Sequence, residues 1–129
     1  MATRAEAENI ERFTDRYRLC CSPVRLNIGG EALGADHGPT GYTARAQADD
    51  LARHLRLEPG DRLADSGSGS GWPGLYLAQR IGCRVAGRDR PFDGLQRARA
   101  RATTERLGDP GACVSRGQTA ACFANSSRQ

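Results

Sequence analysis

A glycine-rich loop with an acidic residue on either side is the part of this sequence best suited to chemistry. The loop is Gly67-Ser68-Gly69-Ser70-Gly71, directly after Asp65 and Ser66, and Asp89 follows 18 residues after its last glycine. Successive glycines let the backbone turn sharply and approach a ligand closely. An acid at the tip of a neighbouring strand can accept hydrogen bonds from both hydroxyls of a ribose. We therefore predict that loop and acid together bind a nucleoside.

Short strands and helices are needed to position the loop. Pro73 suits the first turn of a helix, and Gly82 suits its left-handed end. The alternation of strand and helix favours an α/β layer with parallel strands, and the ligand would lie across the carboxyl ends of the first two. The pattern predicts strands over 62–66, 83–87 (ending near Asp89) and 112–114, and helices over 72–80 and 92–107.

The sequence before these strands predicts helices, and the sequence after them predicts disorder. One predicted helix has an apolar face that consists of Ile10, Phe13 and Tyr17. For a second helix Thr43 is a plausible N-cap, and its apolar face consists of Ala44, Ala48, Leu51 and Leu55. The predicted helices cover 4–19 and 44–56, and the breaker-rich stretch 20–41 is predicted as a loop. We divide the chain into an N-terminal helical and loop segment over 1–60, a partial α/β unit over 61–115 and a disordered tail over 116–129.

Two glycine motifs overlap in the loop. One is G-x-G-x-x-G, typical of dinucleotide binding, and it ends at Gly74. The other is D-x-G-x-G-x-G, which begins at Asp65. We prefer the second, because the first would put Gly67 and Ser68 inside the strand, where glycine is unfavourable. Only the second gives Asp65 a role, either attracting a cationic ligand or fixing the loop through backbone N–H groups.

The stretch 57–95 resembles the opening of class I S-adenosylmethionine-dependent methyltransferases, through the motif that begins at Asp65 and the acid at position 89. The resemblance implies that Gly67 and Gly69 approach the methionine and ribose portions, that Asp89 holds the ribose hydroxyls and that Arg90 lies near the adenine edge. Tyr42 is similar in position to segments that fold over the cofactor in this family. The implied cofactor-binding residues are Asp65, Gly67, Ser68, Gly69, Gly71, Asp89, Arg90 and Tyr42.

The resemblance implies a partial Rossmann-like methyltransferase fold, preceded by N-terminal helices, with S-adenosylmethionine as cofactor. The expected reaction is methyl transfer to a small-molecule acceptor, and no catalytic residue can be assigned. Ala64 and Ser66 stand where the family usually has apolar residues, and Arg88 beside the acid is unusual. Family members also continue through further strands that are not recognisable after Val114. We therefore expect a truncated methyltransferase, covering the N-terminal half, whose activity is left open.

Composition agrees with a small core and leaves two other classes of function open. Leu, Ile, Val and Phe make up about 16% of the chain, below the roughly 20% at which a packed core becomes doubtful. All 19 basic residues are arginine and the net charge is +4. The arginines are scattered along the chain, which argues against a nucleic-acid surface. The alternatives are a fragment of a dinucleotide-binding oxidoreductase and a non-enzymatic, arginine-rich interaction module.

Targeting signals and cysteine usage indicate a cytoplasmic location. The sequence has neither a secretory signal nor an apolar run long enough for a membrane span, so we expect no membrane partner. The oligomeric state cannot be predicted. The five cysteines are odd in number and lack a CxxC pair, so we predict reduced thiols and no metal site. His37 and His54 have no partner at catalytic spacing.

Overall fold

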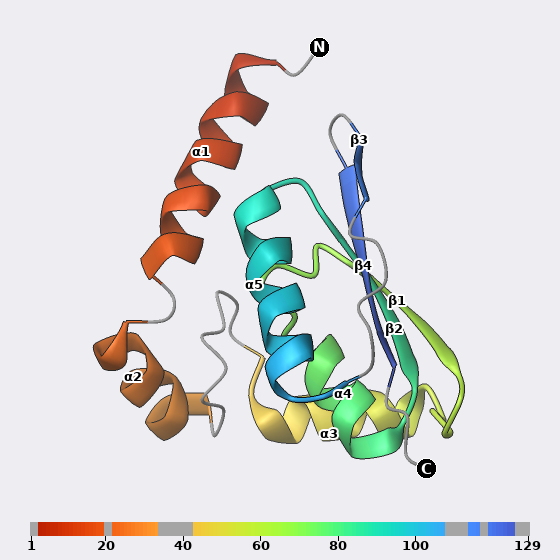
Figure 1. The fold of residues 1–129 in the computed structure, drawn as a ribbon. Helices are drawn as coiled ribbons and strands as arrows, with labels where there is room; N and C mark the ends of the chain where they lie inside the picture. The colour runs from red at the N-terminus through yellow and green to blue at the C-terminus, as the bar shows by residue number, and fades with distance from the viewer. Residues whose placement is uncertain (1–2, 20–21, 34–42, 108–113, 117–118, 126–129) are drawn as a thin grey trace.

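A four-stranded sheet with helices packed against it forms the centre of the fold (Figure 1). The computed structural model describes residues 3–19, 22–33, 43–107, 114–116 and 119–125. The helices are α1 (Arg4–Leu19), α2 (Pro23–Leu33), α3 (Arg45–His54), α4 (Gly74–Ile81) and α5 (Phe92–Thr104). The strands are β1 (Arg62–Ser66), β2 (Arg84–Asp89), β3 (Val114–Arg116) and β4 (Thr119–Asn125).

The sheet is mixed, with strand order β1-β2-β4-β3. β1 and β2 pair in parallel, with Leu63 opposite Val85, and α4 connects them, as the sequence predicted. The third strand, β3, runs in the same direction as β1 and β2, but it pairs with neither of them, because the unpredicted strand β4 lies between β2 and β3 and is antiparallel to both. Only two positions separate β3 from β4. Such a short connection permits an antiparallel pair, whereas a parallel crossover needs about a dozen residues.

The predicted disordered tail is wrong for Thr119–Asn125, which forms β4 between β2 and β3. Positions 120–124 are a continuous apolar run, which lacks the alternation by which a strand is usually recognised. Backbone pairing explains the strand better than side-chain pattern does, because β4 covers the edge of β2 that β1 leaves open. Residues 126–129 and the predicted strand positions 112–113 lie outside the described residues.

Part of the predicted loop over 20–41 is also helical, since Pro23–Leu33 forms α2. The Ser22 hydroxyl accepts a hydrogen bond from the Arg25 N–H at 3.4 Å, and the Ser22 carbonyl accepts one from the Leu26 N–H at 3.0 Å. Ser22 therefore caps a helix whose first residue is a proline, a start signal that the many glycines concealed. Val24 and Ile28 remain more than half exposed, so α2 adds little to the core.

The other helix predictions hold with small shifts at their ends. α1 has the predicted bounds, and Gly82 ends α4 with a left-handed φ of 87°. Thr43 is not the N-cap of α3: Ala44 has that place, and its N–H donates to the Gln47 side-chain oxygen at 2.8 Å. Of the apolar face predicted for α3, Ala48 is buried while Leu51 and Leu55 are exposed. No described helix is long and apolar enough to cross a membrane.

The hydrophobic core lies between one face of the sheet and helices α4 and α5. Leu77, Leu95 and Cys83 are its largest fully buried side chains, and Ala98 and Ala102 let α5 pack closely. Burial raises the pKa of the Cys83 thiol. The core is one layer thick because alternate residues on the other face of β1 are exposed. This arrangement fits the small share of large apolar residues in the chain.

Gly74 is the first residue of α4 and marks the closest approach of that helix to the sheet. A Cβ atom there would lie 2.8 Å from Asp65 Oδ2 and 3.0 Å from Val85 Cγ1. We expect Gly74→Ala to lower the free energy of unfolding by about 1–3 kcal/mol, because atoms on both strands would have to shift. The measurement is urea denaturation followed by circular dichroism.

Gly30→Ala is the matched control for that substitution. A Cβ at Gly30, within α2, would meet nothing within 4 Å. Alanine also favours helix over glycine by roughly 0.5–1 kcal/mol, so the control should be neutral or slightly stabilising. Equal destabilisation by the two substitutions would contradict the described packing of α4.

Candidate functional site

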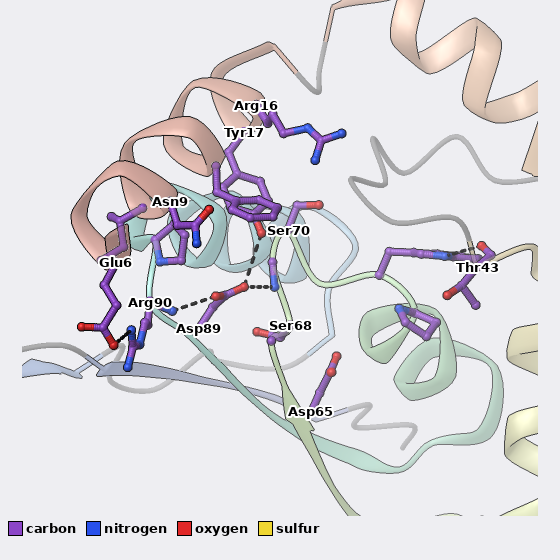
Figure 2. A pocket seen from close by; sticks show the side chains of 17 residues that line it. Glu6, Asn9, Arg16, Tyr17, Thr43, Asp65, Ser68, Ser70, Asp89 and Arg90 are labelled. Carbon is purple, nitrogen blue, oxygen red and sulfur yellow. Dashed lines mark hydrogen bonds and ion pairs between the residues drawn. The ribbon is translucent and has the colours of Figure 1, made fainter. Parts of the chain in front are cut away.

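A pocket of about 660 Å³ opens where β1 and β2 end, between the glycine-rich loop and α1 (Figure 2). Its volume lies within the roughly 300–1,000 Å³ typical of small-molecule sites. The lining residues come from α1 (Glu6, Asn9, Ile10, Phe13, Arg16 and Tyr17), from the end of β1 and the loop (Asp65, Gly67, Ser68, Gly69 and Ser70), from the end of β2 and the two residues after it (Asp89, Arg90 and Pro91), and from Thr43, Trp72 and Pro73.

Hydrogen bonds fasten the loop to the end of β2. The N–H groups of Gly67 and Ser68 both donate to the Arg88 carbonyl, at 2.7 and 3.1 Å. β1 ends at Ser66, and the three following glycines have positive φ: 77° at Gly67, 51° at Gly69 and 97° at Gly71. The loop therefore starts where the preferred motif predicted, and its glycines adopt conformations that other residues rarely take.

Gly69 also lies against two other elements. A Cβ there would be 2.7 Å from the Tyr17 hydroxyl, and a Cβ at Gly94 would be 3.0 Å from the Gly69 carbonyl. The loop is thus held between α1 and the first turn of α5, with no room for a side chain on either glycine. Gly94 could not be recognised from the sequence as part of the site, because a lone glycine early in a helix has no distinctive signal.

Asp89 is the residue on which the loop, α1 and β2 meet. Its Oδ2 atom accepts the Gly69 N–H at 2.6 Å and the Tyr17 hydroxyl at 3.3 Å (Figure 2). Its Oδ1 atom accepts the Arg90 N–H at 2.7 Å. The prediction that the loop and Asp89 lie side by side is confirmed, while the nucleoside itself stays a prediction. The carboxylate orients the loop before any ligand arrives.

Asp65 and Ser68 present polar atoms that lack a protein partner among the described residues. Asp65 Oδ2 and Ser68 Oγ are both buried without a hydrogen bond, and both residues line the pocket. Burial, and then the negative charge of Asp89, raise the pKa of Asp65. A buried polar atom without a partner is costly. These atoms are therefore suited to a ligand that brings hydrogen-bond donors or positive charge.

Helix α1 forms the wall of the pocket opposite the loop, a role that the sequence analysis missed. The Arg90 guanidinium donates to Glu6 at 2.9 Å, and Arg18 lies 3.4 Å from Asp93 on α5. The shared face of Ile10, Phe13 and Tyr17 was the available signal. That pattern indicates a packed helix face, but it cannot say that the helix packs over a ligand site.

The remaining predicted site residues divide between the pocket, the core and the part of the chain outside the described residues. Arg90 lines the pocket, and Gly71, the last residue of the loop, packs against the core, where a Cβ would meet Leu75 Cδ1 at 2.5 Å. Tyr42 is outside the described residues. Trp72 lines the pocket, with its ring nitrogen donating to the Thr43 carbonyl at 2.8 Å.

Gly74 gives the alternative glycine motif a structural counterpart as well. In dinucleotide-binding proteins, the third glycine of G-x-G-x-x-G allows close packing of helix on strand. Gly74 has this role here, because its α-carbon lies directly against Asp65 and Val85. The conformation of the loop therefore favours the motif that begins at Asp65. The packing of α4 against the strands is also compatible with the motif that ends at Gly74.

None of the family models, curated proteins or solved structures compared with the chain matches it. Within the described residues, no group of three or more histidine, cysteine or acidic side chains could hold a metal ion.

Asp65→Asn should stabilise the protein at neutral pH. Because burial raises the pKa of this carboxyl in the folded state, folding is favoured by its protonated form, and stability falls as pH rises from about 4 through the raised pKa. An amide keeps the shape without the charge. We expect a melting temperature several degrees higher near pH 7, on a scale of about 4–8 °C per kcal/mol for a domain of this size.

Thermal unfolding of both proteins between about pH 4 and pH 8 tests this expectation, because the difference should shrink as the solution becomes more acidic. Asp50→Asn, at an exposed position of α3, is the matched control. A lower melting temperature for Asp65→Asn at neutral pH would show that Asp65 has a stabilising partner after all.

Glu6 should make attachment of α1 sensitive to acid. The Thr3 backbone N–H and then the Arg90 guanidinium lower the pKa of Glu6 from 4.5 to about 2. A lowered carboxyl pKa contributes stability that is complete above 4.5 and is lost as pH falls toward 2. The melting temperature of Glu6→Gln should therefore fall less than that of the wild type over this pH range. The control Glu11→Gln, on the same helix, should behave like the wild type. Identical profiles for all three proteins would contradict the Glu6 contacts.

Proposed function

We propose that this chain binds S-adenosylmethionine in the pocket and belongs to a methyl-transfer system. The observation that carries the proposal is the contact between the Gly69 N–H and the Asp89 carboxylate, at the adjoining ends of two parallel strands. Ligands of open α/β sheets bind beyond the carboxyl ends of the strands. The resemblance of the loop to the first motif of class I methyltransferases adds the chemical identity of the ligand.

The polar side of the pocket fits the groups of this cofactor. Asp89 would accept the ribose hydroxyls, which would take the place of the Tyr17 hydroxyl at Oδ2. Asp65 Oδ2 and Ser68 Oγ would gain the donors that they lack in the protein. Two carboxylates in one pocket also attract a ligand that carries positive charge on its amino and sulfonium groups.

The apolar side of the pocket suits the exclusion of water and the orientation of an acceptor. Ile10 and Phe13 on α1 face the loop across the pocket, and Trp72 closes another side. The cofactor supplies the electrophilic methyl group when it is bound. The protein would contribute proximity and alignment of the acceptor, which can account for most of the rate of such a transfer. We propose a small molecule as the acceptor and assign no general base.

The β1–α4–β2 unit is the part of the fold that supports a Rossmann-like assignment. It supplies a parallel strand pair, a glycine-rich turn and an acid at the end of the second strand. The antiparallel strands β3 and β4 do not follow from that assignment. We therefore restrict the proposed relationship with methyltransferases to this unit.

Isothermal titration calorimetry with two ligands separates this proposal from a dinucleotide-binding function. We expect S-adenosylhomocysteine to bind the wild-type chain and NAD⁺ not to bind. Asp89→Asn should weaken S-adenosylhomocysteine binding at least about tenfold, which corresponds to 1.4 kcal/mol. Asp50→Asn, the same chemical change away from the pocket, should leave it unaltered.

Binding of NAD⁺ without S-adenosylhomocysteine would overturn the proposal in favour of the motif that ends at Gly74. Equal affinity in the wild type and Asp89→Asn would show that the ligand binds away from the loop. Circular dichroism of each variant establishes that the fold is intact before titration.

A further inference from the structure

One charged side chain of the pocket has no charged partner within the described residues. Arg16 lines the pocket and is half-buried. Figure 2 shows it extending from α1 on the Thr43 side of Tyr17. Its guanidinium makes no ion pair or hydrogen bond in the part of the chain that the structure describes, and it lies 5.6 Å from the centroid of the Phe13 ring. The aromatic contact holds the guanidinium in place but does not neutralise its charge.

Comparable arginines around the pocket do have polar partners. Arg90, the other basic residue among the described lining residues, donates to Glu6 at 2.9 Å. Arg12, one turn before Arg16 on α1, donates to the Asn9 side chain at 3.0 Å. Arg16 is therefore the cation of the pocket whose charge is left for a ligand to balance.

The sequence of α1 explains why Arg16 lacks an acidic partner on its own helix. Side chains three or four positions apart on a helix are neighbours. Within α1 these positions around Arg16 hold Arg12, Phe13 and Leu19, so the helix offers one like charge and no acid. Partial burial of a charge is costly without a compensating group. Position 16 is therefore suited to an anionic group that a ligand supplies.

The two walls of the pocket differ in charge. Asp65 and Asp89 lie on the wall formed by the loop and the strand ends, whereas Arg16 lies on α1. The acidic wall suits the positively charged groups of the proposed cofactor. Arg16 lies against Phe13 and thus belongs to the apolar side, which we assigned to the acceptor. An anionic group at Arg16 is therefore better explained by the acceptor than by the cofactor.

Trp72 gives the apolar side of the pocket a fixed aromatic surface. Its ring nitrogen donates to the Thr43 carbonyl at 2.8 Å, and its ring packs on Tyr76 with the centroids 5.3 Å apart. A rigid aromatic ring favours a flat, apolar partner, since aromatic rings pack well on one another. Arginine forms paired hydrogen bonds with a carboxylate. Tryptophan and Arg16 together therefore fit an aromatic ring that carries an acid group.

We propose that Arg16 binds the carboxylate of a small aromatic acid in this pocket. One guanidinium balances one negative charge, which favours a carboxylate over a phosphate group with a charge of about −1.5 to −2. Under the proposed function, on which this identification rests, the aromatic acid is the methyl acceptor. Arg16 would then determine which acceptors bind and how they are aligned with the cofactor.

Titration of the full chain with benzoate and benzamide, with and without saturating S-adenosylhomocysteine, tests the proposal. Trp72 is the only tryptophan in the chain, so its fluorescence reports binding in the pocket. We expect benzoate to bind, and benzamide, which has nearly the same shape without the charge, to bind at least about tenfold more weakly. Arg16→Gln should lower the affinity for benzoate to that for benzamide and leave the affinities for benzamide and S-adenosylhomocysteine unaltered.

Arg12→Gln is the matched control, because Arg12 lies at a similar 5.7 Å from the Phe13 ring but is exposed and does not line the pocket. This variant should bind benzoate like the wild type. Absence of benzoate binding, or equal benzoate affinity in the wild type and Arg16→Gln, would overturn the proposal.

The two ligands also separate the acid site from the cofactor site. Weaker S-adenosylhomocysteine binding in Arg16→Gln, with benzoate binding unchanged, would overturn the proposal, because Arg16 would then hold the carboxylate of the cofactor. Benzoate binding that depends on Arg16, in a chain that does not bind S-adenosylhomocysteine, would uphold the acid site and overturn the proposed function alone.

Discussion

A hydrogen bond from the Gly69 backbone to the Asp89 carboxylate determines how the parts of the site fit together. Hydrogen bonds to charged groups contribute roughly 1.5–3 kcal/mol, and this one is supported by a second, from Tyr17 to the same oxygen. The loop follows β1, the acid ends β2 and the tyrosine lies on α1. One carboxylate therefore joins three elements that are far apart in the sequence, and the shape of the pocket depends on it.

The local part of the fold could be predicted because its signals are local. The strand ending at Ser66, the helix ending at Gly82 and the glycine loop between them are determined by residues within a few positions. β4 could not be predicted, because its apolar run lacks alternation and its pairing partner is distant in sequence. α2 was missed for a different reason: the glycines around it outweighed the start signal at Ser22 and Pro23.

The residues of the candidate site could likewise be predicted only where their signals are close together in the sequence. Motif spacing predicted the loop and Asp89, which the structure brings together. The same spacing is silent about α1, because the residue that reaches the acid, Tyr17, is 72 positions away from it. Arg62 and Arg84 are a further example, because they are distant in sequence and only the register of β1 with β2 places them side by side.

Mapping of amide chemical shifts by NMR during titration with S-adenosylhomocysteine tests the central claim most directly. We predict the largest shifts at the amides of Gly67, Gly69 and Arg90, because the loop and the carboxylate of Asp89 would contact the adenosyl group. Smaller shifts should extend to Tyr17 as its hydroxyl leaves Asp89. Shifts confined to residues outside the pocket, or no shifts at saturating ligand, would contradict the account.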